Sequence, residues 1–161
     1  FAVFNGIGRP VFGWLTDRLS ARTAMLLSYA QIITAAGLML WAKNGSVGLF
    51  AAAFSIFWFN VGGWLAIAPT ATNNLYGPKH YSQNYGIVFT AYGIGAVLGV
   101  SSSGVLLDTF QNYDYIFYLV IASCLMGSLL TLMLLTGNRA YKNEVAAEKH
   151  LPDLAGRNSS H

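Results

Sequence analysis

Four long runs without a charged residue decide what this chain can fold into. They cover residues 23–42, 44–78, 81–107 and 115–138, and are 20, 35, 27 and 24 residues long. A helix needs about 20 apolar residues to cross the hydrocarbon core of a bilayer, so each run is long enough to span a membrane. Only 9% of the residues are charged, against about a quarter in a typical soluble domain. We therefore expect a polytopic membrane protein.

The spans are expected to be helices. The strands of a membrane barrel would show roughly ten-residue segments of alternating polarity, and residues 116–135 show none. A fifth, shorter apolar segment covers residues 1–15 and is interrupted by Arg9. The predicted fold class is thus an all-α transmembrane helix bundle over residues 1–137, followed by a polar tail over 138–161. The chain begins with Phe and has no signal-peptide pattern, so we expect further residues upstream.

The basic residues outside the spans predict the orientation. One side of the membrane would hold seven Lys and Arg residues and the other would hold one, Lys43. The seven are Arg18, Arg22, Lys79, Arg139, Lys142, Lys149 and Arg157. Cytoplasmic loops carry an excess of Lys and Arg, so we expect the tail to be cytoplasmic and the protein to lie in the cytoplasmic membrane. This topology accounts for the net charge of +3, and no nucleic-acid partner is expected.

Residues for enzyme chemistry are not evident. Cys124 is the lone cysteine and lies in the last span, the three histidines lie in a loop and the tail, and no Cys/His group has metal-ligand spacing. We predict no catalytic residue, no metal and no cofactor. A polytopic membrane enzyme or a scaffold remains a remote alternative.

The third uncharged run carries small residues at every fourth position: Ala91, Gly95, Gly99 and Ser103. Such residues lie on one helix face and let two backbones approach closely in a membrane. We expect this face to press against another helix. Rigid packing and a smooth surface for helix movement remain equally open.

The second uncharged run combines aromatic side chains with polar ones. Trp58 and Asn60 are candidates for an aromatic wall and a hydrogen bond to a solute, although packing also explains the aromatic residues. Pro69 lacks an N–H and clashes with the preceding turn, so we expect a kink or break over residues 65–69. Broken helices often line cavities in transporters.

Arg9 lies inside a predicted span. It precedes Asp17 by eight residues, or about 12 Å along a helix, which places it near the middle of a core about 30 Å thick if Asp17 is at the surface. A charge at that depth needs a water-filled cavity or a partner. Its planar guanidinium matches a carboxylate, so Arg9 is the candidate anion ligand. A shallower position, or pairing with a carboxylate outside this chain, would also explain it.

Two segments carry a family resemblance. Residues 5–18 read NGIGRPVFGWLTDR and residues 84–93 read NYGIVFTAYG. Together they resemble the oxalate/formate antiporter branch of the major facilitator superfamily. The resemblance covers nearly all of residues 1–135 and implies helices 8–12 of a 12-helix transporter. Helices 2–6 of such a transporter would have the same orientation, so the assignment to helices 2–6 remains an alternative. It also implies a missing N-terminal helix bundle as the partner of this one, and the lipid bilayer as its surroundings.

The resemblance also implies a mechanism, in which two bundles rock about a central site. Gly13, Asp17, Arg18 and Arg22 would form a conformational latch, with Asp17 accepting hydrogen bonds from a neighbouring helix N-terminus. Ser20 and Ala21 stand where the family has Gly and a basic residue, so one latch charge is absent.

A further departure concerns the substrate. Tyr92 stands where the oxalate carriers of this branch have a lysine. One cation, Arg9, suits one carboxylate, so we expect a secondary active transporter of a small organic anion of the monocarboxylate kind, with Tyr92 in the site, rather than an oxalate carrier. A transporter of a non-anionic solute, working by proton symport or efflux, is the alternative.

Overall fold

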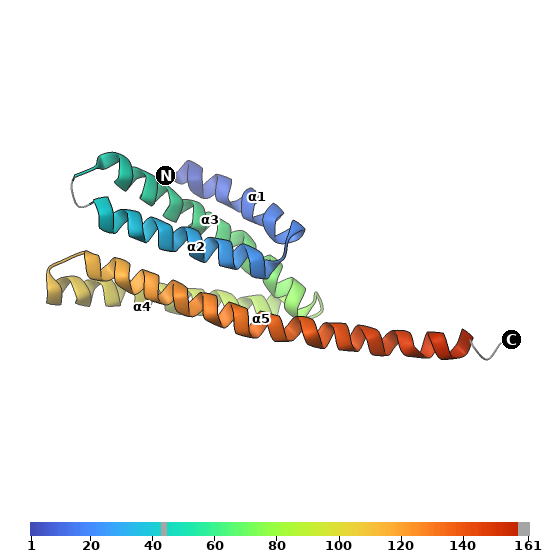
Figure 1. The fold of residues 1–161 in the computed structure, drawn as a ribbon. Helices are drawn as coiled ribbons and strands as arrows, with labels where there is room; N and C mark the ends of the chain where they lie inside the picture. The colour runs from blue at the N-terminus through green and yellow to red at the C-terminus, as the bar shows by residue number, and fades with distance from the viewer. Residues whose placement is uncertain (43–44, 158–161) are drawn as a thin grey trace.

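The computed structural model describes the backbone of residues 1–42 and 45–157, and the side chains of that part up to residue 135. Within it the chain forms five helices that lie side by side (Figure 1). They are α1 (Ala2–Arg18), α2 (Ala21–Trp41), α3 (Val47–Tyr76), α4 (Tyr81–Phe110) and α5 (Asp114–Arg157). The predicted all-α fold class is confirmed.

Four of the described helices are long and apolar enough to cross a membrane: α2, α3, α4 and the Asp114–Leu135 part of α5. The first predicted span forms α1, a helix of 17 residues that carries Arg9, Asp17 and Arg18, and its length and composition alone do not identify it as a span. No break in α5 marks the expected boundary between residues 137 and 138, since the helix continues to Arg157. The tail's side chains and residues 158–161 lie outside the described residues.

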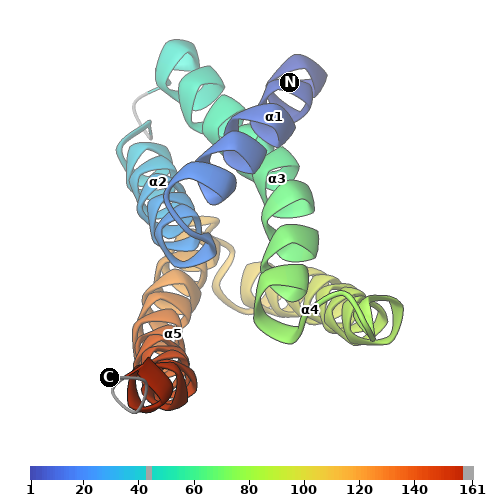
Figure 2. The ribbon, with the colours of Figure 1, turned by 90° about the vertical axis from the view of Figure 1, so that its right-hand side faces the viewer.

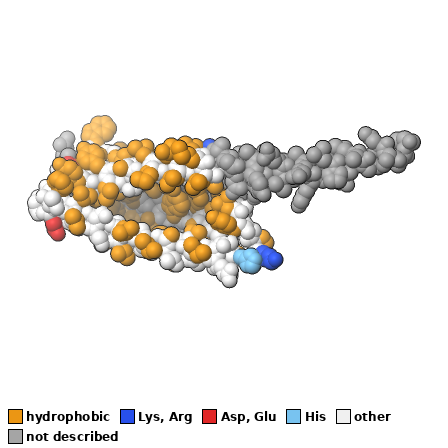
Figure 3. Space-filling view, turned by 90° about the horizontal axis from the view of Figure 1, so that it is seen from below, with side chains coloured by type: hydrophobic (Ala, Val, Ile, Leu, Met, Phe, Trp, Pro, Cys, Tyr) orange, Lys and Arg blue, Asp and Glu red, His pale blue; other side chains and the backbone are white. Residues whose placement is uncertain are grey.

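The connections between the helices lie at the two opposite ends of the bundle. The α1–α2 and α3–α4 connections lie at the end from which α5 extends, and the α2–α3 and α4–α5 connections lie at the other (Figure 1). The basic residues Arg18, Arg22 and Lys79 adjoin the first end. In the space-filling view, blue side chains are seen at this end and red ones at the opposite end (Figure 3). Lys43 lies outside the described residues.

The charged segment 16–22 is less of a loop than its sequence suggests. Thr16, Asp17 and Arg18 belong to the last turn of α1, and only Leu19 and Ser20 connect it to α2. The Ser20 hydroxyl oxygen accepts a hydrogen bond from the Thr23 N–H at 3.2 Å and so caps α2. Since two residues suffice for the connection, α1 and α2 are forced to be antiparallel neighbours.

Pro69 does not break α3, so the break is excluded from the two expected alternatives, a kink or a break over residues 65–69. The helix continues from Val47 to Tyr76 and curves along its length (Figure 2). Just after Pro69, the hydroxyls of Thr70 and Thr72 donate to the carbonyl oxygens of Ala66 and Ala68, which precede it, at 3.0 and 2.7 Å. Such bonds to the preceding turn accompany bending of helices.

The closest packing joins α1 to α3 through glycine. A Cβ atom on Gly8 would collide with the Phe59 carbonyl, and one on Gly62 would collide with the Asn5 backbone. Gly63 makes room for the ring of Phe12, which is 1% exposed. Phe12, Ala24 and Ile67 form the buried centre, surrounded by Leu15, Met25, Phe59 and Trp64. Small residues thus set the helix spacing here.

Helix α4 is the least enclosed element. It has no buried residue, and it lies apart from α1 and α2 when the bundle is seen along its length (Figure 2). The expected packing stripe lies on this helix: Ala91, Gly95 and Gly99 are exposed, Ser103 is half-buried, and no described atom lies within 4 Å of a Cβ built on Gly95 or Gly99. Within the described residues the two glycines of this stripe pack against no other helix.

Candidate functional site

A groove between α3 and α4 contains two of the predicted solute contacts, Asn60 and Tyr92. Its volume is about 400 Å³, and Ile32 of α2 forms part of its floor. Five aromatic residues line it: Phe57, Trp64, Tyr85, Phe89 and Tyr92. We call it the α3–α4 groove.

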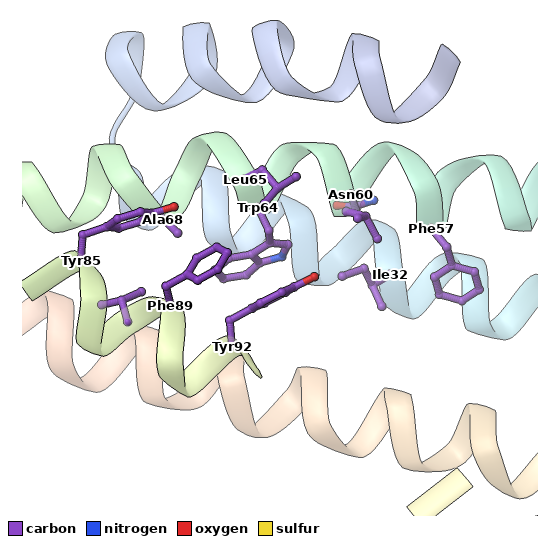
Figure 4. Close-up of a pocket in the computed structure, with 11 residues that line it drawn as sticks. Ile32, Phe57, Asn60, Trp64, Leu65, Ala68, Tyr85, Phe89 and Tyr92 are labelled. Carbon is purple, nitrogen blue, oxygen red and sulfur yellow. The ribbon is translucent and has the colours of Figure 1, made fainter. Parts of the chain in front are cut away.

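Helical periodicity builds both walls of this groove. The α3 wall consists of residues 57, 60, 61, 64, 65 and 68, and the α4 wall of residues 85, 88, 89 and 92. Both sets follow the three- and four-residue spacing that places side chains on one helix face. The Phe89 and Tyr92 ring centroids are 5.7 Å apart, and Figure 4 shows Trp64 beside them.

The groove is apolar apart from a few hydrogen-bonding atoms. Its lining contains no charged side chain, and its polar side-chain atoms are the Tyr85 and Tyr92 hydroxyls, the Trp64 indole N–H and the Asn60 amide. Tyr92 is 56% exposed, so its hydroxyl is available to a ligand, whereas Asn60 is 2% exposed. An aromatic surface of this kind suits the apolar part of a solute better than a carboxylate.

Asn60 is held by the protein on three sides. Its Oδ1 accepts a hydrogen bond from Ser28 Oγ at 2.7 Å, while its Nδ2 donates to Gln31 Oε1 at 3.1 Å and to the Ile56 carbonyl at 2.9 Å. A side-chain amide has two N–H donors, so both are engaged. Asn60 can therefore offer a solute only the remaining lone pair of Oδ1.

Arg9 and Trp58 lie outside the groove lining. Arg9 is exposed and Trp58 is 39% exposed. Arg9 follows Gly8 and Trp58 precedes Phe59, and the backbones of α1 and α3 meet at Gly8 and Phe59, so both residues are next in sequence to the α1–α3 crossing. The structure thus brings Asn60 and Tyr92 to one groove, and it leaves Arg9 and Trp58 outside the lining of that groove.

The predicted latch residues lie at the end of the bundle where α1 meets α2. Asp17 lines a shallow cavity of about 540 Å³ together with Asn73 and Pro78 near the end of α3, and Tyr81, the first residue of α4. His80, the N-cap residue of α4, makes no side-chain capping bond. An uncapped helix N-terminus attracts a carboxylate, so Asp17 is near a suitable partner. Arg18 is exposed, Arg22 is half-buried, and Gly13 makes ordinary contact with Ala66.

Sequence reasoning missed the partners of Asn60 and of the α1–α3 crossing. Ser28 and Gln31 are polar residues three positions apart in an otherwise apolar run, which is a signal for interhelical hydrogen bonding in membranes. Gly8 and Gly62 each share a helical turn with a second glycine, Gly6 and Gly63, but these pairs do not recur along the helices and so gave no periodic signal. Among the described residues, no three His, Cys, Asp or Glu side chains are close enough to hold a metal ion.

These features define a class of protein: a multi-pass membrane helix bundle with a cavity among its spans and a charged turn at one end. The family profile of the Major Facilitator Superfamily matches residues 1–158. The chain belongs to this superfamily, whose members are transporters rather than enzymes. The predicted resemblance to the superfamily is confirmed.

Several curated relatives carry transport functions in their names. The chain is 29% identical to YhjX, an uncharacterised MFS-type transporter of Escherichia coli, over 60% of this chain and 24% of the relative. It is 35% identical to mouse monocarboxylate transporter 14, over 44% of this chain and 14% of the relative. It is 24% identical to the oxalate:formate antiporter of Oxalobacter formigenes, over 89% of this chain and 34% of the relative. The chain thus spans at most about a third of the length of these relatives, and no solved structure matches it.

Proposed function

We propose that this chain is part of a secondary active transporter that moves a small organic anion, of the monocarboxylate kind, across the cytoplasmic membrane by alternating access. The observation that carries the proposal is Arg9, the one Lys or Arg residue inside the predicted spans. A guanidinium in a membrane core is costly unless it faces water or an anion. Relatives named as monocarboxylate transporters and as an oxalate:formate antiporter support an anionic solute.

The proposed solute contacts are of two kinds, one charged and the others aromatic. Arg9 binds the carboxylate, and Trp58 and Tyr92 contact the rest of the solute. Asn60 contributes at most an acceptor, because its two N–H groups are engaged. A solute with one carboxylate needs only one such cation.

The proposed partner of this bundle is the N-terminal bundle of the same protein. The chain covers only 14–34% of the length of the three relatives described above, and α4 has no buried residue. We assign to the missing bundle the surface of α4 that carries Ala91, Gly95, Gly99 and Ser103. Asp17 then acts as a latch on the α4 N-terminus in one conformation, with the tail in the cytoplasm.

A second candidate is a Major Facilitator transporter of a non-anionic solute. It is favoured by one observation, the absence of any charged side chain from the lining of the α3–α4 groove. In that case the groove would hold an uncharged, apolar molecule, and Arg9 would pair with a carboxylate of the missing bundle.

Uptake by proteoliposomes that contain the full-length protein tests the two candidates. We expect labelled lactate to be taken up, and unlabelled formate to compete with it better than oxalate. The variant Tyr92→Lys adds a second cation, so it should raise the relative competition by oxalate. The matched control is Tyr85→Lys, because Tyr85 lies on the same wall of the groove about two helical turns from Tyr92. A wild-type preference for oxalate would contradict the assignment of Tyr92, and no uptake of any of the three acids would favour the non-anionic solute.

A further inference from the structure

A buried hydrogen-bonded group joins α2 to α3. Ser28 Oγ donates to Asn60 Oδ1 at 2.7 Å, and Asn60 Nδ2 donates to Gln31 Oε1 at 3.1 Å. Ser28 is 0% exposed and Asn60 is 2% exposed. Both residues lie well inside their helices, between apolar neighbours on every turn. Polar side chains in such surroundings are costly unless they bond to each other.

The orientation of the Asn60 amide follows from chemistry alone. The Ile56 carbonyl at 2.9 Å can only accept a hydrogen bond, so the atom facing it must be the donor, Nδ2. The opposite atom is then Oδ1, which faces the Ser28 hydroxyl donor. The second N–H of Nδ2 needs an acceptor, and Gln31 Oε1 supplies it. Each bond therefore fixes the next, and a rotation of α3 against α2 would break all the interhelical ones together.

This group lies directly behind the α3–α4 groove. Asn60 and Ile32, the residue after Gln31, both line the groove. One turn along α3, the Trp64 ring packs on Tyr29, the residue after Ser28, with ring centroids 5.5 Å apart. The rotation of α3 about its axis decides whether Trp64 and its neighbours face α4 or turn away from it.

We propose that Ser28, Gln31 and Asn60 form an interhelical clamp that fixes the rotation of α3 against α2 and so keeps the aromatic face of α3 turned toward α4. Asn60 is then a positioning residue rather than a solute ligand. Apolar contact between two membrane helices is a weak constraint on rotation, because lipid is as apolar as the partner helix. Directional hydrogen bonds supply the missing specificity, as single polar residues do in coiled coils.

A double-mutant cycle on the full-length protein tests the clamp. The variants are Ser28→Ala, Asn60→Leu and the two combined, and the matched control is Ser55→Ala. Ser55 lies in α3 and its hydroxyl donates only to the Ala51 carbonyl of its own helix, at 2.7 Å. The measurement is the thermal midpoint Tm of the purified protein in detergent. We expect Ser28→Ala to lower Tm by about 1–4 °C, Ser55→Ala to leave it unchanged, and Ser28→Thr, which keeps the hydroxyl, to restore it.

Non-additivity is the mark of a clamp. In the double variant, Ser28→Ala should add almost nothing to Asn60→Leu, because its hydrogen bond is already lost. If Ser28→Ala behaves like Ser55→Ala, or if the two effects add in full, the clamp is wrong. Should Asn60→Leu fail to fold, Asn60→Ala replaces it in the cycle, because it also removes the acceptor of the Ser28 hydroxyl, and the same non-additivity is expected.

Lactate uptake gives a second readout, and only this readout rests on the proposed function. With a clamp, Ser28→Ala and Asn60→Leu both lower the maximal rate, by roughly three- to twenty-fold, and KM changes little. If Asn60→Leu raises KM while Ser28→Ala has no effect, Asn60 is a solute ligand and the proposal fails. If the wild-type protein takes up no lactate, the proposed function fails while the melting cycle still decides the clamp.

Discussion

Glycine at the α1–α3 crossing shows how single residues set the architecture of this bundle. Gly8 and Gly62 face backbone atoms of the opposite helix, which cannot move aside as a flexible side chain can. Other glycines in the spans, such as Gly37, have no atom within 4 Å of a Cβ built on them. The same residue type is therefore essential at one position and replaceable at another.

The variant Gly62→Ala should separate α1 from α3. Its Cβ would collide with the Asn5 backbone, and overpacking of this kind typically costs about 1–3 kcal/mol. We expect a lower Tm for the full-length protein, measured by thermal melting in detergent. The matched control is Gly37→Ala in α2, which should leave Tm unchanged or raise it, because Ala favours the helix by up to about 1 kcal/mol. Equal Tm values for the two variants would show that the crossing is looser than described.

Arg9 is the residue on which the anionic solute depends. If it binds the carboxylate, Arg9→Gln leaves that charge without a partner, at a typical cost above about 2 kcal/mol, or roughly thirty-fold in affinity. Labelled lactate uptake should be nearly abolished while Tm changes little, since Arg9 is exposed in this bundle. Arg9→Lys keeps the charge but loses the planar fork, so it should retain partial uptake. Full uptake by Arg9→Gln would remove Arg9 from the solute site.

At the scale of helices, α4 is attached in a different way from the others. Its side chains line the α3–α4 groove, yet none of them is buried. Its N-terminus, without a side-chain cap from His80, lies beside the cavity that Asp17 lines. The position of α4 therefore depends on contacts at its end and on whatever covers its outer face in the full-length protein.

Neutralising Asp17 tests the proposed latch on α4. Asp17→Asn keeps the shape and removes the charge that the helix dipole favours, an interaction worth about 0.3–2 kcal/mol. The maximal rate of lactate uptake should fall more than the apparent affinity, because the latch stabilises one conformation and does not touch the solute. The control is Asp108→Asn, the same change near the C-terminal end of α4. A weaker affinity at an unchanged rate would instead make Asp17 a solute contact.

At the scale of the whole molecule, the connections sort into two ends, and the basic residues that adjoin them follow this division. The end that holds the α1–α2 and α3–α4 connections carries Arg18, Arg22 and Lys79, and α5 extends from it (Figure 1). An excess of Lys and Arg is typical of the cytoplasmic side of a membrane protein.

Cysteine labelling in intact cells tests this orientation. On a cysteine-free full-length background that includes Cys124→Ser, we expect Ser46→Cys and Asn112→Cys to react with a membrane-impermeant maleimide. His80→Cys should react only after the membrane is permeabilised, because the α3–α4 connection would be cytoplasmic. Labelling of His80→Cys in intact cells, with protection of the other two, would invert the topology.

The sequence by itself determined the number of helices and the way their ends alternate. Uncharged runs of 20 residues or more allow one structure in lipid, because each backbone must satisfy its own hydrogen bonds there. The local motif of residues 5–18 was also enough to indicate the superfamily. Helix ends were less certain: residues 16–18 continue α1, and α3 runs on through Pro69.

Only the tertiary structure decided which faces of these helices meet. The regular stripe from Ala91 to Ser103 predicted close helix packing. In the described residues, however, the close contact between α1 and α3 lies at Gly8 and Gly62. From the sequence, Asn60 was expected to offer a hydrogen bond to a solute. In the structure, its two N–H groups donate to Gln31 and Ile56 instead. The physical reason is that apolar helices in a membrane are nearly uniform around their axes, so sequence patterning does not say which side turns inward. Rotation is set by pairwise contacts between residues far apart in the chain, and those exist only in the folded bundle.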